Sequence, residues 1–335
     1  MPVASPLAER GEDMPSPSIR EFKYGADDYP ALAAIDTAVY PEYPGNADDT
    51  RYDDENFDRT RYVLKRYVAE IGGRIVGYGV YYHMTSRFHP QRFWMWLAVH
   101  PNHQRQGIGG LLYERLLADL RKLDAIAVGT SSRETMQGSL AFLAKRGFRE
   151  VLRSWESRLD VTTFDPNPFQ QYLDRVGRDG IVLTPLALEK QRDPQWLDKV
   201  YDLHTTAMAD VPSHTPYTPP PLDQFVRYAI ESPWVLLDGY YVAVDGDRYV
   251  GESYLNRNKD EPGHLYQGLT GVRQEHRGRG LAMALKLATI GYARDHGYTM
   301  IKTWNATVNE GMLAINGKLG FVRQPAWIEF EKTLP

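Results

Sequence analysis

The chain has 335 residues, of which 42% are hydrophobic and 12% aromatic, and its formal net charge is −4. A chain of this length is long enough for two domains with separate cores. The charge is not that of a typical nucleic-acid-binding protein, which carries a basic surface, so we expect no nucleic-acid partner. The absence of cysteine excludes disulfides, thiolate metal ligands and a cysteine nucleophile.

The start of the chain, residues 1–18, is rich in Pro, Ser and Glu and is expected to form a disordered tail. It lacks a basic segment followed by an apolar one, which a secretory signal would have. No apolar run in the sequence approaches the roughly 20 residues that span a bilayer. We therefore expect a cytoplasmic protein with no membrane partner.

Hydrophobic spacing predicts the same series of elements in each half of the chain. The first half is expected to contain a strand at 19–24, a helix at 27–39, a polar loop at 46–58, a hairpin turning at Gly72, a strand at 93–99, a helix at 107–123, a strand at 125–129, a helix at 139–145 and a strand at 148–159. The second half repeats the series from residue 181, with a strand at 265–272, a helix at 281–296 and strands near 301–304 and 327–332.

A glycine-rich loop occurs in both halves, 173 residues apart. The first copy reads Val99-His-Pro-Asn-His-Gln104-Arg105-Gln106-Gly107-Ile108-Gly109, and the second reads Val272-Arg-Gln-Glu-His-Arg277-Gly278-Arg279-Gly280-Leu281-Ala282. Small residues let the main chain approach a ligand closely, and the N–H groups of the helix that follows point at an anion. Each loop therefore predicts a backbone that holds a pyrophosphate.

Two further matches keep the same order and nearly the same offset. The hairpin segment 68–77 recurs as 242–251, and Lys145-Arg-Gly147-Phe148 recurs as Lys318-Leu-Gly320-Phe321. The repeat is far longer than that of a solenoid, so it predicts two similar domains in tandem. We place them at 19–164 and 181–335, joined by a linker at 165–180.

The order of hairpin, apolar strand, glycine loop, long helix, strand and closing Gly-Phe resembles the GNAT superfamily of N-acetyltransferases, once in each half. The resemblance implies an α+β fold, in which helices flank a mixed, mostly antiparallel and splayed sheet, in two tandem GNAT-like domains. It implies acetyl-CoA as co-substrate and no metal. Tandem members of the superfamily include mycothiol-synthase-like proteins, which the second half resembles in its motifs.

The resemblance also implies which residues bind the cofactor. In the second half they are Val272, Arg277, Gly278, Arg279, Gly280, Leu281, Ala282, Asn305 and Asn309. In the first half they are Val99, Gln104, Arg105, Gln106, Gly107, Ile108 and Gly109.

The family's second motif, Asn-x-x-Ala-x-x-Leu-Tyr-x-Lys-x-Gly-Phe, differs between the halves. The second half keeps Asn309 but has Asn316 where the family has its general-acid Tyr. The first half has neither the Asn nor the Tyr. We therefore expect 181–335 to be catalytic and 19–164 to be a degenerate domain, with water or another tyrosine protonating the thiolate.

The catalytic candidates in the second half are Glu252 and Asn316. Glu252 is the carboxylate that the pattern places best to act as the general base. Its counterpart in the first half is Tyr78. The alternative is that Glu252 lies on the exposed face of an antiparallel strand. Asp210 is a weaker candidate because it precedes a turn at Pro212, and His204 is expected to serve in helix packing.

The predicted function is transfer of an acetyl group from acetyl-CoA to a primary amine of a small molecule or peptide, by direct attack in a ternary complex. The protein would act as a monomer or homodimer. Loss of the family's Tyr from both halves favours a second interpretation, a non-catalytic acyl-CoA-binding or sensor protein. A dinucleotide-binding oxidoreductase is a third, but its glycine loop belongs to the first strand-to-helix turn, whereas here the loop follows a hairpin.

Overall fold

A computed structural model describes residues 16–25, 28–258 and 261–335 of the chain. Residues 1–15 of the predicted tail, and residue 27 at the predicted start of the first helix, lie outside this part. The packing divides the described chain into two compact units. The first contains residues 16–83 and 93–125, and the second contains residues 84–92 and 126–335.

The first unit has an antiparallel sheet in the order β1-β2-β3-β4. Its strands are β1 (Ser18–Glu21), β2 (Leu64–Ile71), β3 (Arg74–Tyr82) and β4 (Arg92–Val99), and its helices are α1 (Tyr29–Val39), α2 (Ala47–Asn56) and α3 (Ile108–Lys122). Successive side chains of β3 face opposite sides of the sheet. Tyr78 donates a hydrogen bond to Asp36 of α1, whereas a side chain at Gly79 would meet Leu116 of α3. The two helices therefore cover opposite faces.

Helix α2 occupies the segment that was expected to be a polar loop at 46–58, so that prediction is wrong. The side chain of Asn46 caps the helix by accepting hydrogen bonds from the main-chain N–H groups of Asp48 and Asp49. The helix buries an ion pair between Asp54 and Arg66 of β2, whose atoms Oδ1 and Nη2 are 3.0 Å apart. Because its buried contact is ionic, the sequence shows no apolar stripe there.

The second unit has a sheet in the order β5-β13-β6-β11-β10-β9-β8-β7, with β12 pairing at the side of β6. Its strands are β5 (Ala127–Arg133), β6 (Arg149–Asp160), β7 (Val182–Pro185), β8 (Val235–Asp245), β9 (Arg248–Arg257), β10 (His264–Val272), β11 (Met300–Ala306), β12 (Val322–Arg323) and β13 (Trp327–Thr333). Its α-helices are α4 (Gln137–Lys145), α5 (Gln170–Arg178), α6 (Leu186–Arg192), α7 (Trp196–Ala209), α8 (Leu222–Phe225), α9 (Leu281–Asp295) and α10 (Glu310–Lys318). The pairs are antiparallel except for β10 and β11, which run parallel.

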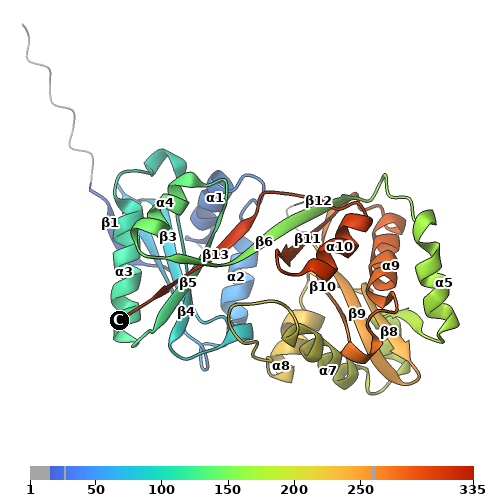
Figure 1. The fold of residues 1–335 in the computed structure, drawn as a ribbon. Helices are drawn as coiled ribbons and strands as arrows, with labels where there is room; N and C mark the ends of the chain where they lie inside the picture. Colours follow the sequence, from blue (N-terminus) through green and yellow to red (C-terminus); the bar gives the residue numbers. More distant parts are fainter. Residues whose placement is uncertain (1–15, 26–27, 259–260) are drawn as a thin grey trace, which may run out of the picture. The chain divides into compact units, whose positions relative to one another are not determined.

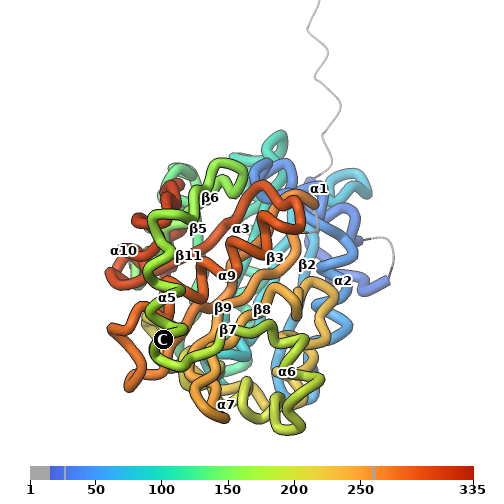
Figure 2. Tube along the Cα trace, turned by 90° about the vertical axis from the view of Figure 1, so that its right-hand side faces the viewer, coloured from blue at the N-terminus to red at the C-terminus, as the bar shows by residue number. Residues whose placement is uncertain are grey.

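The C-terminal strand β13 lies in the interior of this sheet, between β5 and β6 (Figure 1). The segment expected to be a linker, 165–180, carries α5, which runs beside α9 (Figure 2). Helices α9 and α7 cover opposite faces of β9 and β10. A side chain at Gly251 would meet Leu285 of α9, whereas one at Gly271 would meet Ala207 of α7.

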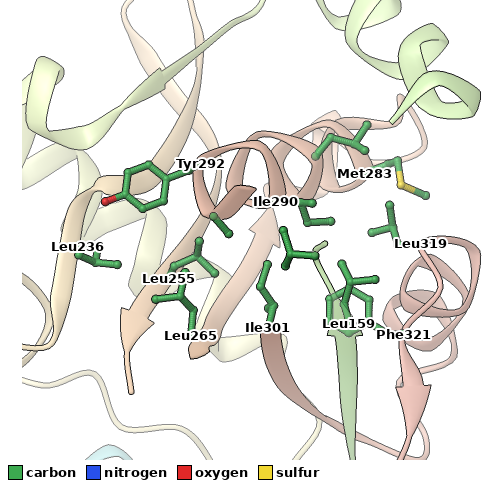
Figure 3. Close-up of a cluster of buried hydrophobic side chains, with 13 residues drawn as sticks. Leu159, Leu236, Leu255, Leu265, Met283, Ile290, Tyr292, Ile301, Leu319 and Phe321 are labelled. Carbon is green, nitrogen blue, oxygen red and sulfur yellow. The ribbon is translucent and has the colours of Figure 1, made fainter. Parts of the chain in front are cut away.

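A core cluster of this unit lies between α9 and the strands beneath it (Figure 3). Met283 and Ile290 of α9 meet Leu255 of β9, Leu265 of β10 and Ile301 of β11. These side chains are at most 3% exposed. The cluster fixes α9 over the central strands.

The fold class expected from the sequence is confirmed, because helices flank a mixed and mostly antiparallel sheet. The oxidoreductase interpretation is wrong, since a dinucleotide-binding fold needs a largely parallel sheet. No helix in the described part of the chain is long and apolar enough to cross a membrane.

A substitution of Ile328 tests the place of β13 in the sheet. The strand lies between β5 and β6, and the side chain of Ile328 is 3% exposed. We expect Ile328→Ala to lower the free energy of unfolding by about 2–4 kcal/mol, since it leaves a cavity. Urea unfolding would measure the change. Thr333→Ala, at the exposed end of the strand, is the control and should change stability by less than about 0.5 kcal/mol. Equal effects of the two substitutions would contradict an interior β13.

Candidate functional site

The site forms where β10 and β11 part. The two strands pair only from His264 to Tyr266 on β10 and from Met300 to Lys302 on β11. Beyond these pairs a cleft of about 760 Å³ is lined by residues 267–272 on one side and 303–305 on the other. The sheet of the second unit is therefore splayed at its one parallel pair.

A β-bulge shapes the β10 wall of this cleft. The register of β10 against β9 shifts between Gln267 and Thr270, so Gly268 and Leu269 lie outside the regular ladder. A bulge leaves main-chain groups unpaired, and both residues line the cleft. A side chain at Gly268 would come within 2.0 Å of the Tyr254 ring, so only glycine fits there.

The two glycine loops have the same backbone conformation. Gly107 and Gly280 are the N-cap residues of α3 and α9, with φ of 86° and 88°. Two residues earlier, Arg105 and Gly278 also have positive φ, of 63° and 76°. Such angles favour glycine, so Arg105 holds its conformation at a cost in strain.

The first residue of each loop motif ties the loop to the end of the preceding strand. Gln104 Nε2 donates to the carbonyl oxygen of Val99 at 2.9 Å. Arg277 Nε donates to the carbonyl oxygen of Val272 at 3.0 Å. The motif therefore begins with Gln or Arg because both side chains can donate this bond.

The N-terminus of α9 opens onto the cleft. No side chain of the described residues caps it, so the N–H groups of its first turn keep their capacity to bind an anion. The arginine side chains of the loop are held by carboxylates. Arg277 pairs with Asp210, and Arg279 Nη2 lies 3.0 Å from Asp179 Oδ2. The loop therefore offers main-chain donors rather than free guanidinium groups.

Most of the cofactor residues predicted in the second half line this cleft. They are Val272, Arg277, Gly278, Gly280, Leu281, Ala282, Asn305 and Asn309, whereas Arg279 does not line it. The predicted residues of the first half form the equivalent loop at the end of β4 and the start of α3: Val99, Gln104, Arg105, Gln106, Gly107, Ile108 and Gly109. The cofactor role of both sets stays a prediction.

The three asparagines that the sequence motifs singled out in the second half have different places. Asn309 caps α10 by accepting from the main-chain N–H of Met312, and Asn305 lies on the β11 wall. Asn316 is 2% exposed behind that wall, and its Nδ2 donates to Asn305 Oδ1 at 2.7 Å. Asn316 therefore holds the amide of Asn305 and does not itself line the cleft.

Glu252 is fully buried on the α7 face of β9, so the alternative that it lies on an exposed strand face is wrong. Its Oε1 lies 3.2 Å from Nδ1 of His204 on α7, and its Oε2 accepts a hydrogen bond from Tyr240. The carboxylate does not line the cleft, but Tyr254, two residues along the strand, does. The sequence missed the contact between Glu252 and His204 because the two residues are 48 positions apart.

The buried carboxylate affects the tyrosines near it. Burial, together with the charge of Glu252, raises the pKa of Tyr240 well above its usual range. The same two causes raise the pKa of Tyr254 to about 12. Both phenols therefore stay protonated at neutral pH.

Two further side chains at the cleft were not identified from the sequence. Tyr172 of α5 lines it, and a side chain at Gly280 would lie 3.0 Å from the Tyr172 ring. Lys286 of α9 lines it as well but is only 1% exposed. Lys286 Nζ donates to Gln267 Oε1 at 3.3 Å, and burial lowers the pKa of this lysine to about 7.

Comparisons with known proteins agree with this arrangement. The model of the acetyltransferase (GNAT) family matches residues 30–148 and 197–321. The chain is similar to the mycothiol acetyltransferase of Salinispora arenicola (strain CNS-205), with 26% identity over 242 residues that cover 71% of this chain and 72% of that protein. It is similar to the mycothiol acetyltransferase of Thermobispora bispora, with 27% identity over 234 residues that cover 68% of this chain and 72% of that protein.

Solved structures share the fold over nearly the whole chain. A tandem GNAT protein from the clavulanic acid biosynthesis pathway has a TM-score of 0.72 and 20% identity, covering 95% of this chain and 98% of that one. A GCN5-related N-acetyltransferase from Sphaerobacter thermophilus has a TM-score of 0.68 and 17% identity, covering 95% of both chains. The expectation of a tandem fold of this kind is confirmed.

The buried amine of Lys286 makes the stability depend on pH. Its pKa is about 7 in the fold and 10.5 in its ordinary state, so between these values the unfolded chain binds a proton that the folded chain does not. The free energy of unfolding therefore rises with pH across this window. At pH 7 and below, the cost of the buried charge is on the order of 4 kcal/mol.

We expect Lys286→Met to raise the free energy of unfolding at pH 7 by about 2–4 kcal/mol and to flatten its rise toward high pH. Urea unfolding at neutral and alkaline pH would measure both effects. Lys190→Met, at an exposed position on α6, is the control for loss of one charge. The same pH dependence in wild type and Lys286→Met would contradict a buried amine.

Proposed function

The chain belongs to the acetyltransferase (GNAT) family, and from this membership we propose that it moves an acetyl group from acetyl-CoA to a primary amine of a small molecule or a peptide. The observation that carries the proposal is the cleft at which β10 and β11 part, with the uncapped N-terminus of α9 at its edge. The relatives named mycothiol acetyltransferase support a small-molecule acceptor.

The second unit binds the cofactor in this proposal. The pyrophosphate of acetyl-CoA lies on the main-chain N–H groups from Gly278 to Ala282, where the helix dipole favours negative charge. The pantetheine arm lies between β10 and β11, the place that the missing strand pairing leaves open. The positively charged side chains of Arg175 and Lys318, which also line the cleft, suit a cofactor with several phosphates.

The reaction is a direct attack of the amine on the thioester. The amine nitrogen bonds to the carbonyl carbon, and the carbonyl oxygen becomes negatively charged. The main-chain N–H of Gly268, in the bulge of the cleft wall, is the donor that supports this charge. The carbon–sulfur bond then breaks, and the electron pair leaves with sulfur. Placement of the two reactants supplies much of the rate enhancement.

Glu252 and Asn316 take part through their neighbours. Glu252 acts as the general base, and it accepts the proton of the attacking amine through its contact His204 and a water molecule, since neither side chain lines the cleft. Asn316 positions Asn305, whose side chain forms part of the cleft wall. We propose that the first GNAT-like domain, 19–164, is a degenerate scaffold and that the second, 181–335, is the catalytic domain.

The glycine at the N-cap of α9 gives the first test. We expect Gly280→Glu to weaken acetyl-CoA binding by at least about 100-fold, equivalent to roughly 2.7 kcal/mol, because a carboxylate would repel the pyrophosphate. Gly107→Glu is the matched control, since Gly107 has the same backbone conformation at the N-cap of α3. Calorimetric titration of both variants with acetyl-CoA would measure the affinities.

The outcomes of this titration separate the interpretations. Loss of binding in Gly107→Glu alone would reverse the assignment of the two halves. Binding of acetyl-CoA without transfer to any amine in a broad screen would favour the non-catalytic interpretation. Circular dichroism and thermal unfolding of each variant would show whether the fold is kept.

The buried carboxylate gives a second test. With an amine that the wild type acetylates, we expect Glu252→Gln to lower kcat by about 100-fold and to leave KM for acetyl-CoA nearly unchanged, because the amide accepts no proton. Steady-state kinetics would measure both constants. Glu114→Gln, at an exposed position on α3, should leave both constants unchanged. An unchanged kcat in Glu252→Gln would remove Glu252 from the reaction.

A further inference from the structure

The amine of Lys286 lies at the cleft with almost no protein partner. The lysine is 1% exposed, and its Nζ donates to one neutral acceptor, Gln267 Oε1, at 3.3 Å. Its other near neighbour is the ring of Phe321, whose centroid lies 5.0 Å from Nζ. An ammonium has three N–H donors, so a group bound in the cleft can receive the others.

No carboxylate in the described part of the chain neutralises this amine. Among the described residues that line the cleft the single carboxylate is that of Asp210, which is held by Arg277. Titratable groups that line the cleft or pack on the core cluster under α9 also include Tyr172, Arg175, Tyr241, Tyr254, His276, Arg277, Tyr298 and Lys318. The pKa of Lys286 is lowered by burial and by none of these charges. A buried amine without a counter-ion is costly, which points to a role that needs it.

The position of Lys286 relative to the glycine loop sets what it can reach. It lies six residues after Gly280 on the same helix, which corresponds to about 9 Å along the helix axis. Its partner Gln267 is the first residue of β10 beyond the pairs with β11. A pantetheine arm that starts at the loop and follows the opening between the strands therefore ends near Lys286.

The amine is also held in a fixed place by the strands. Gln267 Nε2 donates to Ser253 Oγ at 2.9 Å and to the main-chain oxygen of Tyr254 at 3.0 Å, which leaves its Oε1 to accept. That oxygen accepts from Lys286 and from Thr289 Oγ1, both at 3.3 Å. The glutamine thus fixes the direction of the amine from the β10 side.

The reaction needs a proton donor at sulfur that the second motif does not supply. The side chain of Asn316 is an amide, which is not an acid, and it is bound to Asn305. The phenol of Tyr254 is a poor donor because its pKa is raised to about 12. The remaining candidate for the proton donor is the buried ammonium of Lys286, which lies beside the inner end of the cleft.

We propose that Lys286 is the catalytic acid of this enzyme, contacting the sulfur of the bound cofactor and protonating the departing thiolate. The proposal rests on the proposed function. As the carbon–sulfur bond breaks, its electron pair moves to sulfur, and a proton passes from Nζ to sulfur to give the CoA thiol. The neutral amine then takes a proton from solvent. The proton of the attacking amine leaves separately, toward Glu252 and His204.

The proton affinities of the two groups suit this transfer. The pKa of Lys286 is about 7, and an ordinary thiol has a pKa of about 8.5, so the proton moves to the more basic group. Near neutral pH the amine is also easily protonated again. A lysine with its usual pKa would be a far weaker acid in this place.

The test uses CoA itself, so it does not need the identity of the acceptor. We would titrate the complexes of CoA with wild type, Lys286→Met and Lys190→Met, and follow the ultraviolet absorbance of the thiolate against pH. The amine of wild type loses its proton near pH 7, before an ordinary thiol ionises, so wild type and Lys286→Met should form the thiolate at a similar pH. Lys190→Met should match wild type. Calorimetry would establish that each protein binds CoA.

A second variant separates proton donation from simple charge. Lys286→Arg keeps a cation but cannot give up its proton, so it should form the thiolate at a pH lower by about one unit or more than wild type and Lys286→Met. With an amine that the wild type acetylates, Lys286→Arg and Lys286→Met should both lose about 100-fold in kcat. The fall in kcat that wild type shows above about pH 7 should be absent from both.

Each outcome decides the proposal. Identical thiolate titrations in Lys286→Arg and Lys286→Met would show that a side chain at this position does not reach sulfur and would overturn it. Full activity in Lys286→Arg would overturn the proton transfer and leave only a positive charge. Failure of wild type to bind CoA would overturn the proposed function together with this proposal, whereas CoA binding with an unchanged titration in Lys286→Arg would overturn this proposal alone.

Discussion

The parting of β10 and β11 is the constraint on which the functional part of the structure depends. These strands run parallel and stay together for three residue pairs. The bulge at Gly268 brings β10 so close to the ring of Tyr254 that no side chain fits there. The cleft and the main-chain groups of its wall follow from the lost pairing, because a continuous sheet would use these groups in its own ladder.

The glycine loops were predictable from the sequence because their geometry is local. A glycine at each N-cap and a positive φ two residues earlier are set by residues within one loop, so their spacing in the sequence is sufficient. The hairpin of β2 and β3 and the long helices after the loops were predictable for the same reason. Repetition of these signals at a nearly constant offset predicted two tandem domains, and the resemblance to the GNAT superfamily implied the fold class.

The features that the sequence did not predict depend on residues far apart in the chain. Helix α2 buries the ion pair between Asp54 and Arg66, so hydrophobic spacing does not mark it. Tyr172 lies in a segment whose composition indicated only a linker, and its place at the cleft comes from the packing of α5 on α9. The burial of Glu252 depends on His204, which reaches it from α7. Such contacts leave no periodic signal in either partner.

Lys286 connects the stability of the fold with its chemistry. It sits on the buried face of α9, next to Met283 and Leu287 of the core cluster, where an apolar side chain would be more stable. Its amine donates to the neutral side chain of Gln267 instead of a carboxylate, so no carboxylate of the described chain raises its proton affinity. A carboxylate beside it would have made the fold more stable and the ammonium a weaker acid. The neutral partner therefore keeps the proton transferable, at the expense of stability.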